Sequence, residues 1–126
     1  MTEQRFTIPG RLPGLNDLYV NYRCPWKARR VKEQAMQAVR IYARLSGIQP
    51  QKERVQATIL CYEPNCRRDE DNVLGGACKV VLDGLVNAGI LQGDGRKYVT
   101  LANCSVQVDR ERPRVEVVLS HAEHVD

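Results

Sequence analysis

The first half of the chain contains two segments with strand spacing and, between them, one with helix spacing. Phe6-Thr7-Ile8 predicts a short strand that Pro9 stops. Apolar residues recur every three or four positions over residues 26–45 and predict a long amphipathic helix, which Ser46-Gly47 ends. Alternation over residues 55–62 predicts a second strand, with one buried face and one mixed face.

The second half predicts one helix followed by two or three strands. The helix is expected over residues 77–88, with Gly89 as its C-terminal cap. An earlier start is disfavoured because Gly75 and Gly76 would each weaken a helix interior by about 1 kcal/mol relative to alanine. Strands are expected over about 98–102, 105–108 and 114–119, with residues 109–113 as a charged hairpin loop and a frayed tail from Ser120.

This order of elements predicts the fold class. Strand, helix, strand, helix and further strands favour a compact α+β fold, with a mixed sheet and two main helices packed on it. The 126 residues are enough for one domain, with its core within about residues 6–119, and too few for two.

Composition and charge limit the class of protein but do not identify its function. No apolar run approaches the roughly 18 residues of a membrane helix, and the N-terminus lacks the apolar segment of a signal peptide. We therefore expect a soluble cytoplasmic protein with no membrane partner. The net charge of +4 permits nucleic-acid binding but does not require it.

Other chemistries are disfavoured by what the sequence lacks. It has no glycine-rich phosphate loop, so no nucleotide cofactor is expected, and its two histidines lie in the tail, so no Ser-His-Asp set is evident. An odd number of cysteines without a C-x-x-C pair predicts free thiols, mostly buried, of which Cys66 is the most exposed. The five are Cys24, Cys61, Cys66, Cys78 and Cys104.

A charged motif, Arg67-Arg68-Asp69-Glu70-Asp71-Asn72, follows the second strand. In extended backbone Asp69 and Asp71 point the same way, so both carboxylates can reach one ion. If the turn that carries Asp94 returns to this strand end, three carboxylates meet and favour Mg²⁺. The simpler alternatives are a local Asp69–Arg68 salt bridge, a helix cap at Asp71 and a turn former at Asp94.

Two other segments offer cations and aromatic rings. The breaker-rich loop over residues 10–25 and the start of the first helix carry Tyr19, Tyr22 and Trp26. These rings either cover an edge of the core or contact nucleic-acid bases. The helix over residues 26–45 has an excess of cations, which is either a solvated face or the border of a polyanion groove.

The charged motif and its surroundings resemble the RusA family of Holliday junction resolvases. The matching residues are Arg68-Asp69-Glu70-Asp71-Asn72, then Lys79-Val80-Val81-Leu82-Asp83-Gly84-Leu85, Ala88-Gly89-Ile90 and Asp94, with Ile8-Pro9, Pro13, Asn16 and Tyr19 near the N-terminus. The similarity extends over about residues 6–119.

The resemblance implies a homodimeric, Mg²⁺-dependent endonuclease, with Mn²⁺ as a substitute, that cuts four-way DNA junctions by paired symmetric nicks. Asp69, Asp71 and Asp94 match the family's metal-binding aspartates, and Lys79 matches its essential lysine. Two identical sites on a two-fold axis suit a two-fold symmetric junction. The residues expected to contact DNA are Arg67, Arg68, Asn72, Arg96, Lys97, Asn16, Tyr19, Lys27 and Arg30.

The chain departs from the family pattern in two places. Three residues, including Gly75-Gly76, are inserted between Asn72 and Lys79, and Gly93 stands where a second acidic residue is frequent. In a regular helix Asp71 and Lys79 would lie about 12 Å apart, so Lys79 is expected to reach the site only if the glycines loop out. A junction-binding protein without activity and a nuclease for other branched DNA are the alternatives.

Overall fold

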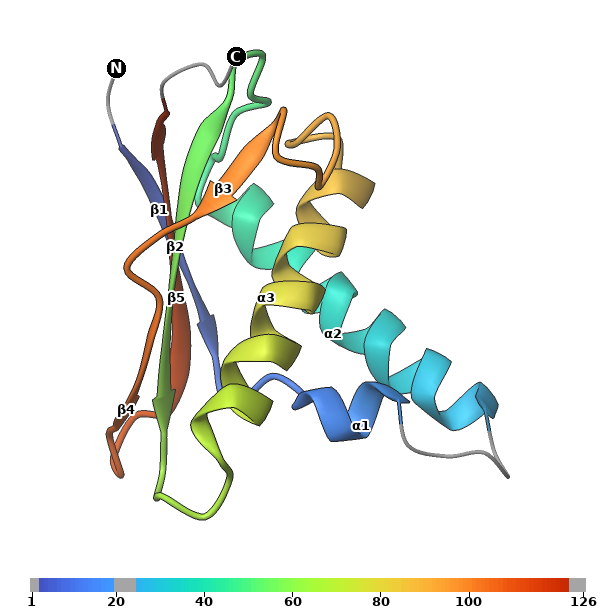
Figure 1. Ribbon diagram of the computed structural model, residues 1–126, viewed down its shortest axis with the longest axis vertical. Coiled ribbons are helices and arrows are strands. Elements are labelled where there is room, and N and C mark those ends of the chain that lie inside the picture. The colour runs from blue at the N-terminus through green and yellow to red at the C-terminus, as the bar shows by residue number, and fades with distance from the viewer. Residues whose placement is uncertain (1–2, 20–24, 123–126) are drawn as a thin grey trace.

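The computed structural model describes residues 3–19 and 25–122 as one mixed sheet with helices on one face (Figure 1). The order is β1 (Gln4–Pro9), α1 (Leu15–Tyr19), α2 (Pro25–Leu45), β2 (Val55–Glu63), α3 (Glu70–Asn87), β3 (Val99–Leu101), β4 (Ser105–Val108) and β5 (Arg114–His121). The expected α+β class is confirmed. None of the described helices is long and apolar enough to cross a membrane.

β2 lies at the centre of the sheet. It pairs antiparallel with β5, which in turn pairs antiparallel with the edge strand β1. On its other side, β3 pairs in parallel with the start of β2 and β4 with its end, so together they form one interrupted edge strand. The segment over residues 109–113 is therefore not the expected hairpin loop, because β4 and β5 lie on opposite sides of β2.

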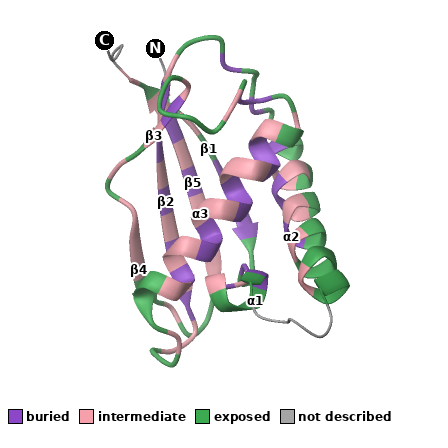
Figure 2. Cartoon of the chain, turned by 45° about the vertical axis from the view of Figure 1, so that its right-hand side comes forward, coloured by how far each residue is buried: buried purple, intermediate pink, exposed green. Residues whose placement is uncertain are grey.

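The core lies between the sheet and the pair α2 and α3 (Figure 2). Alternate residues of β2, from Val55 to Cys61, are buried against the helices. From α2, Val39 and Ala43 reach this layer, and Val80, Val81 and Leu85 come from α3. The alternation and the helical spacing in the sequence thus identified the buried faces correctly.

The expected start of the second helix is wrong. α3 begins at Glu70 and continues through both glycines. A Cβ on Gly76 would overlap the carbonyl oxygen of Pro13, and one on Gly75 would overlap the side chain of Leu15. The glycines therefore let the 13–15 segment approach α3 closely, which offsets their poor helix propensity.

Two other expectations change. The loop over residues 10–25 contains a short helix, α1, that was not expected. The C-terminal tail is ordered further than predicted, because β5 continues to His121 and the Ala122 N–H donates to Arg54 O at 3.1 Å.

Candidate functional site

A buried carboxylate organises the end of β2 from which the charged motif emerges. Glu63 continues the buried side of the strand and is only 3% exposed. Arg68 donates from Nε to Glu63 Oε1 at 2.8 Å and from Nη2 to Oε2 at 2.9 Å. Arg11 donates from Nη2 to Oε1 at 2.8 Å. A buried charge is tolerated when it is paired in this way.

The arginines also set the ionisation of Glu63. Burial alone would raise the pKa of this carboxyl, but the hydrogen bonds from Arg68 and Arg11 outweigh it and hold the pKa below its ordinary value. Glu63 is therefore ionised at neutral pH. It belongs to the scaffold, since both of its oxygens are occupied by arginine donors.

The same network holds the 11–17 segment against α3. Arg68 Nη1 donates to Leu12 O at 3.1 Å, and the Asn16 N–H donates to Asn72 Oδ1 at 2.9 Å. The Asn72 amide lies so close to Gly14 that a Cβ there would come within 2.6 Å of Asn72 Nδ2. Arg68 and Asn72, both expected to contact DNA, make these hydrogen bonds within the fold, and their contact with DNA stays a prediction.

Asp69 and Asp71 are exposed members of the motif. Asp69 is the N-cap residue of α3, with extended backbone and no side-chain capping bond, and it is exposed. Asp71 is also exposed, and its Oδ1 accepts the adjacent Asn72 N–H at 3.0 Å. Within residues 3–19 and 25–122 no ion pair involves either carboxylate, because Arg68 pairs with Glu63 rather than Asp69.

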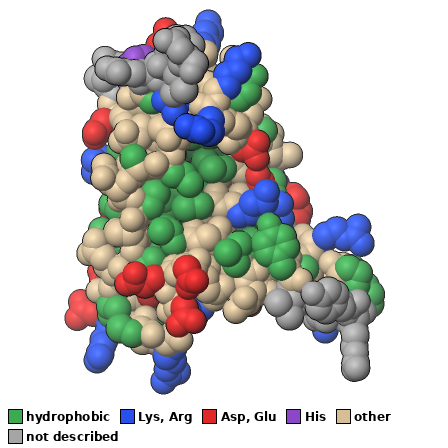
Figure 3. Space-filling view, viewed as in Figure 1, with side chains coloured by type: hydrophobic (Ala, Val, Ile, Leu, Met, Phe, Trp, Pro, Cys, Tyr) green, Lys and Arg blue, Asp and Glu red, His purple; other side chains and the backbone are tan. Residues whose placement is uncertain are grey.

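A cavity of about 260 Å³ opens beside Asp69. Its walls come from the loop after β2, the first residues of α3 and the end of β4, where Val108 is 47% exposed. The start of α3 places the positive end of its dipole here, which favours anionic groups. The space-filling view shows acidic side chains at this lower end of the molecule (Figure 3).

Asp94 lies at the opposite end of α3. The helix has 18 residues, so Asp71 and the last helical turn are separated by roughly 24 Å. The expectation that the Asp94 turn returns to the strand end is wrong for a single chain, because α3 is continuous through its glycines. In the described part of the chain, no three acidic, histidine or cysteine side chains form a group that could hold a metal ion.

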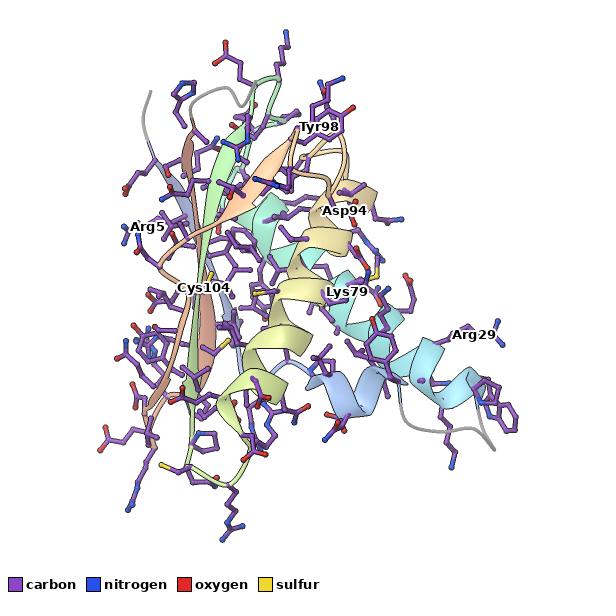
Figure 4. All side chains as sticks on the ribbon, viewed as in Figure 1. Arg5, Arg29, Lys79, Asp94, Tyr98 and Cys104 are labelled. Carbon is purple, nitrogen blue, oxygen red and sulfur yellow. The ribbon has the colours of Figure 1, made fainter. Side chains whose placement is uncertain are left out.

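Lys79 lies on α3 between these two ends, and Figure 4 labels both Lys79 and Asp94. Its Nζ is 3.6 Å from Asp83 Oδ2, and Lys32 Nζ of α2 is 2.7 Å from the same oxygen. Asp83 and Asp94 both line a cavity of about 310 Å³ between α2, α3 and the 93–94 turn. Lys79 therefore does not loop back toward Asp71 but belongs to an ion-pair cluster further along the helix.

The remaining predicted DNA contacts fall into three places. Arg67 is exposed in the loop before α3, and Asn16 and Tyr19 are exposed on α1, which packs beside the start of α3. Lys27 and Arg30 are exposed on the first turns of α2. Arg96 and Lys97 are exposed at the Asp94 end, where Lys97 Nζ lies 5.6 Å from the Tyr98 ring centroid.

Two of the three aromatic residues expected at this loop, Tyr19 and Trp26, do not cover the core. Tyr19 is 61% exposed and Trp26 is 53% exposed, so the expectation that they shield a core edge is wrong for these two rings. Tyr22 lies outside the described residues. Proteins that bind single-stranded nucleic acid commonly stack its bases on exposed aromatic rings.

Sequence reasoning missed Glu63, Arg11 and the Lys32–Asp83 pair. The first had a visible signal, since Glu63 continues the buried alternation of Val55, Ala57, Ile59 and Cys61. A charged residue on the buried side of a strand needs charged or polar partners, and Arg11 and Arg68 are those partners.

No protein-family model matches the chain, and no curated protein is detectably similar to it in sequence. The resemblance to the RusA family therefore rests on the residues quoted above, and membership stays a prediction.

Proposed function

We propose that this protein is a metal-dependent endonuclease for branched DNA, of the four-way junction type, with its site at the start of α3. The observation that carries the proposal is the division of the charged motif. Arg68 and Asn72 make hydrogen bonds within the fold, whereas Asp69 and Asp71 are exposed and form no ion pair with any residue that the structure describes.

The donor set fits Mg²⁺. This ion usually takes one or two protein carboxylates and completes its shell with water and substrate phosphate, so a third carboxylate from the same chain is not required. Asp69 and Asp71 would hold the ion, which would lower the pKa of a bound water and stabilise the leaving 3′-oxygen. Arg67 is exposed in the loop before α3, and Asn16 and Tyr19 are exposed on α1, which packs against α3; these three would bind the DNA backbone and an unpaired base.

A homodimer would give the Asp94 end a role. Asp71 and the last turn of α3 are separated by roughly 24 Å, and Asp94 follows that turn, so a second copy of the chain would have to bring an Asp94 carboxylate to an Asp69–Asp71 pair. The same two-fold axis would place two sites on the two equivalent strands of a junction.

The test is cleavage of a synthetic four-way junction by the purified protein with Mg²⁺. Asp71→Asn should reduce the cleavage rate by at least about 100-fold, since the carboxylate holds the ion on which catalysis depends. Glu53→Gln is the matched control, because Glu53 is 74% exposed and lies before β2, at the other end of the sheet. The absence of Mg²⁺-dependent cutting by wild-type protein that binds the junction would reject the enzyme.

A second candidate is a junction-binding protein without nuclease activity. The observation that favours it is the dispersal of the four proposed catalytic residues, with Lys79 paired to Asp83 and Asp94 at the far end of α3. A gel shift in EDTA separates the candidates, since a binder retains the junction and does not cut it when Mg²⁺ is added. Equal cutting of linear duplex would instead indicate a nuclease without junction specificity.

A further inference from the structure

The cavity beside Asp69 lies where the chain leaves the sheet. β2 ends at Glu63, residues 64–69 connect it to α3, and α3 begins at Glu70. The edge strand β4 runs beside the end of β2, and its last residue, Val108, pairs with Glu63 and is 47% exposed. The helix therefore leaves the end of β4 uncovered, and the cavity of about 260 Å³ opens there.

One wall of the cavity is apolar. Val106 and Val108 are two residues apart on β4, so their side chains share one face of the sheet. Their register partners Cys61 and Glu63 belong to the buried side of β2, so this face looks toward the helices. Val106 packs on the core, and Val108 continues the wall to the surface. Figure 3 shows apolar side chains beside acidic ones at this end of the molecule.

The other walls are polar and come from residues 65–70. Asn65 Oδ1 accepts the Arg67 N–H at 3.0 Å, which fixes this side chain in the loop. The Arg68 guanidinium is held by its two bonds to Glu63, and Glu70 is exposed at the start of α3. Amide and carboxylate groups offer donors and acceptors to the edge of a nucleobase, and a fixed guanidinium plane offers a surface for stacking.

We propose that this cavity holds one unpaired nucleobase of a branched DNA. The inference rests on the proposed function, because a branch point supplies unstacked bases and Asp69 belongs both to the cavity and to the proposed metal site. A base is joined to its phosphate through one sugar, so a base in the cavity would place the phosphate of its own nucleotide close to Asp69. At about 260 Å³ the cavity is smaller than the roughly 300 Å³ of pockets for drug-sized ligands, which suits a single ring system.

A backbone phosphate is the other DNA group that could enter the cavity, and the walls disfavour it. The start of α3 attracts anions, but the carboxylates of Asp69 and Glu70 line the same space and repel them. Val106 and Val108 offer a phosphate no side-chain donor, so this wall would desolvate its charge without compensation. A neutral base instead gains from contact with apolar side chains.

Cys66 provides a test on the wild-type chain, because it lines the cavity and is exposed, as the sequence predicted. In EDTA, a bound four-way junction should slow alkylation of Cys66 by iodoacetamide at least about 5-fold, as for a base that is held by stacking. A junction with abasic residues at the branch point should slow it less than about 2-fold, since no base can enter. Equal protection by both junctions would overturn the proposal, because the DNA would then cover the cavity without filling it.

A matched pair of variants tests the apolar wall. Val108→Gln changes the exposed valine of the cavity, and Leu101→Gln makes a similar change at a residue that is 43% exposed on β3, the other part of the edge strand. A fluorescent purine analogue at the branch point should brighten when wild-type protein binds in EDTA, because its base leaves the stack. Val108→Gln should reduce this rise by about half or more, and Leu101→Gln should retain it. The same rise with all three proteins would contradict the pocket.

The pocket and the endonuclease fail separately in these experiments. Cleavage of the junction in Mg²⁺ without base-dependent protection of Cys66 would reject the pocket and leave the endonuclease. Base-dependent protection without cleavage would reject the endonuclease and leave a base pocket in a junction-binding protein. A purified protein that binds no junction would reject both.

Discussion

Replacement of Arg68 is the most direct test of how the site is built. Arg68→Ala removes both guanidinium bonds to Glu63 and the bond to Leu12 O, and leaves a carboxylate that is 3% exposed with Arg11 as its remaining partner. The change therefore acts on a buried charge and on the segment that carries α1.

The magnitude follows from these contacts. Removal of one partner from a buried ion pair costs about 3–5 kcal/mol of unfolding free energy. Because Arg11 still donates to Glu63, we expect the lower end of this range, about 3 kcal/mol, which is roughly 10–15 °C in Tm for a domain of this size. Arg67→Ala is the matched control, since Arg67 is exposed, and should change stability by less than about 0.5 kcal/mol.

Urea unfolding followed by circular dichroism, with a double-mutant cycle, measures the effect. Glu63→Leu combined with Arg68→Met should recover most of the loss of either single change, because an apolar pair leaves no buried charge and Arg11, with a side chain 40% exposed, can turn to water. The alternative role for Arg68, a phosphate contact, predicts weaker DNA binding and a shallower salt dependence at unchanged stability. An Arg68→Ala protein within about 1 kcal/mol of wild type would refute the anchoring role.

Three more predictions concern Gly76, Glu63 and Asp83. Gly76→Ala should lower stability by about 2 kcal/mol in urea unfolding despite alanine's better helix propensity, because its Cβ would overlap Pro13 O, whereas Gly95→Ala, which meets open space, should not. The pKa of Glu63 is lowered in the folded state, so its contribution to stability is complete above the unfolded pKa of about 4.3 and is lost as the pH falls through the folded value. Urea unfolding at pH 7 and pH 3 should therefore show a smaller pH dependence for Glu63→Gln than for wild type. Asp83→Asn should cost less than about 1 kcal/mol in the same assay, because Lys32 and Lys79 are 35% and 41% exposed, and a larger loss would place the cluster in the core.

The sequence predicted those parts of the fold whose stabilising contacts repeat at regular spacing. α2 begins at Pro25 against an expected residue 26, and β2 was expected over residues 55–62 against Val55–Glu63. Both elements bury one face, so their apolar residues recur in the sequence with the period of a helix or a strand. The α1 helix has no such signal, because it is too short to show a period. Its residues are held by individual hydrogen bonds, from the Asn16 N–H to Asn72 Oδ1 and from the Gly14 N–H to Asp17 Oδ2.

The start of α3 failed for the opposite reason. Local propensity counts Gly75 and Gly76 as two penalties, and it contains no information about a segment some 60 residues earlier that needs the space of two missing side chains. The same glycines left room for Lys79 to reach Asp71, because a helix that starts at residue 77 leaves a flexible connection where the structure has a continuous helix. A close approach between distant segments is therefore what the sequence could not reveal here.

In the charged motif, two residues with contacts inside the fold, Arg68 and Asn72, flank the exposed acidic residues of the proposed site. A carboxylate that is to bind a metal must remain unpaired in the free protein, yet a loop at a strand end must be fixed for two carboxylates to act together. Arg68, immediately before Asp69, is drawn inward by Glu63, and Asn72, immediately after Asp71, is drawn inward by the Asn16 N–H. The two aspartates are thus held from both sides by neighbours that take up the buried contacts. Because the anchors and the free carboxylates are adjacent in sequence, Arg68→Ala should alter metal-dependent cleavage as well as stability, whereas Asp71→Asn should alter cleavage alone.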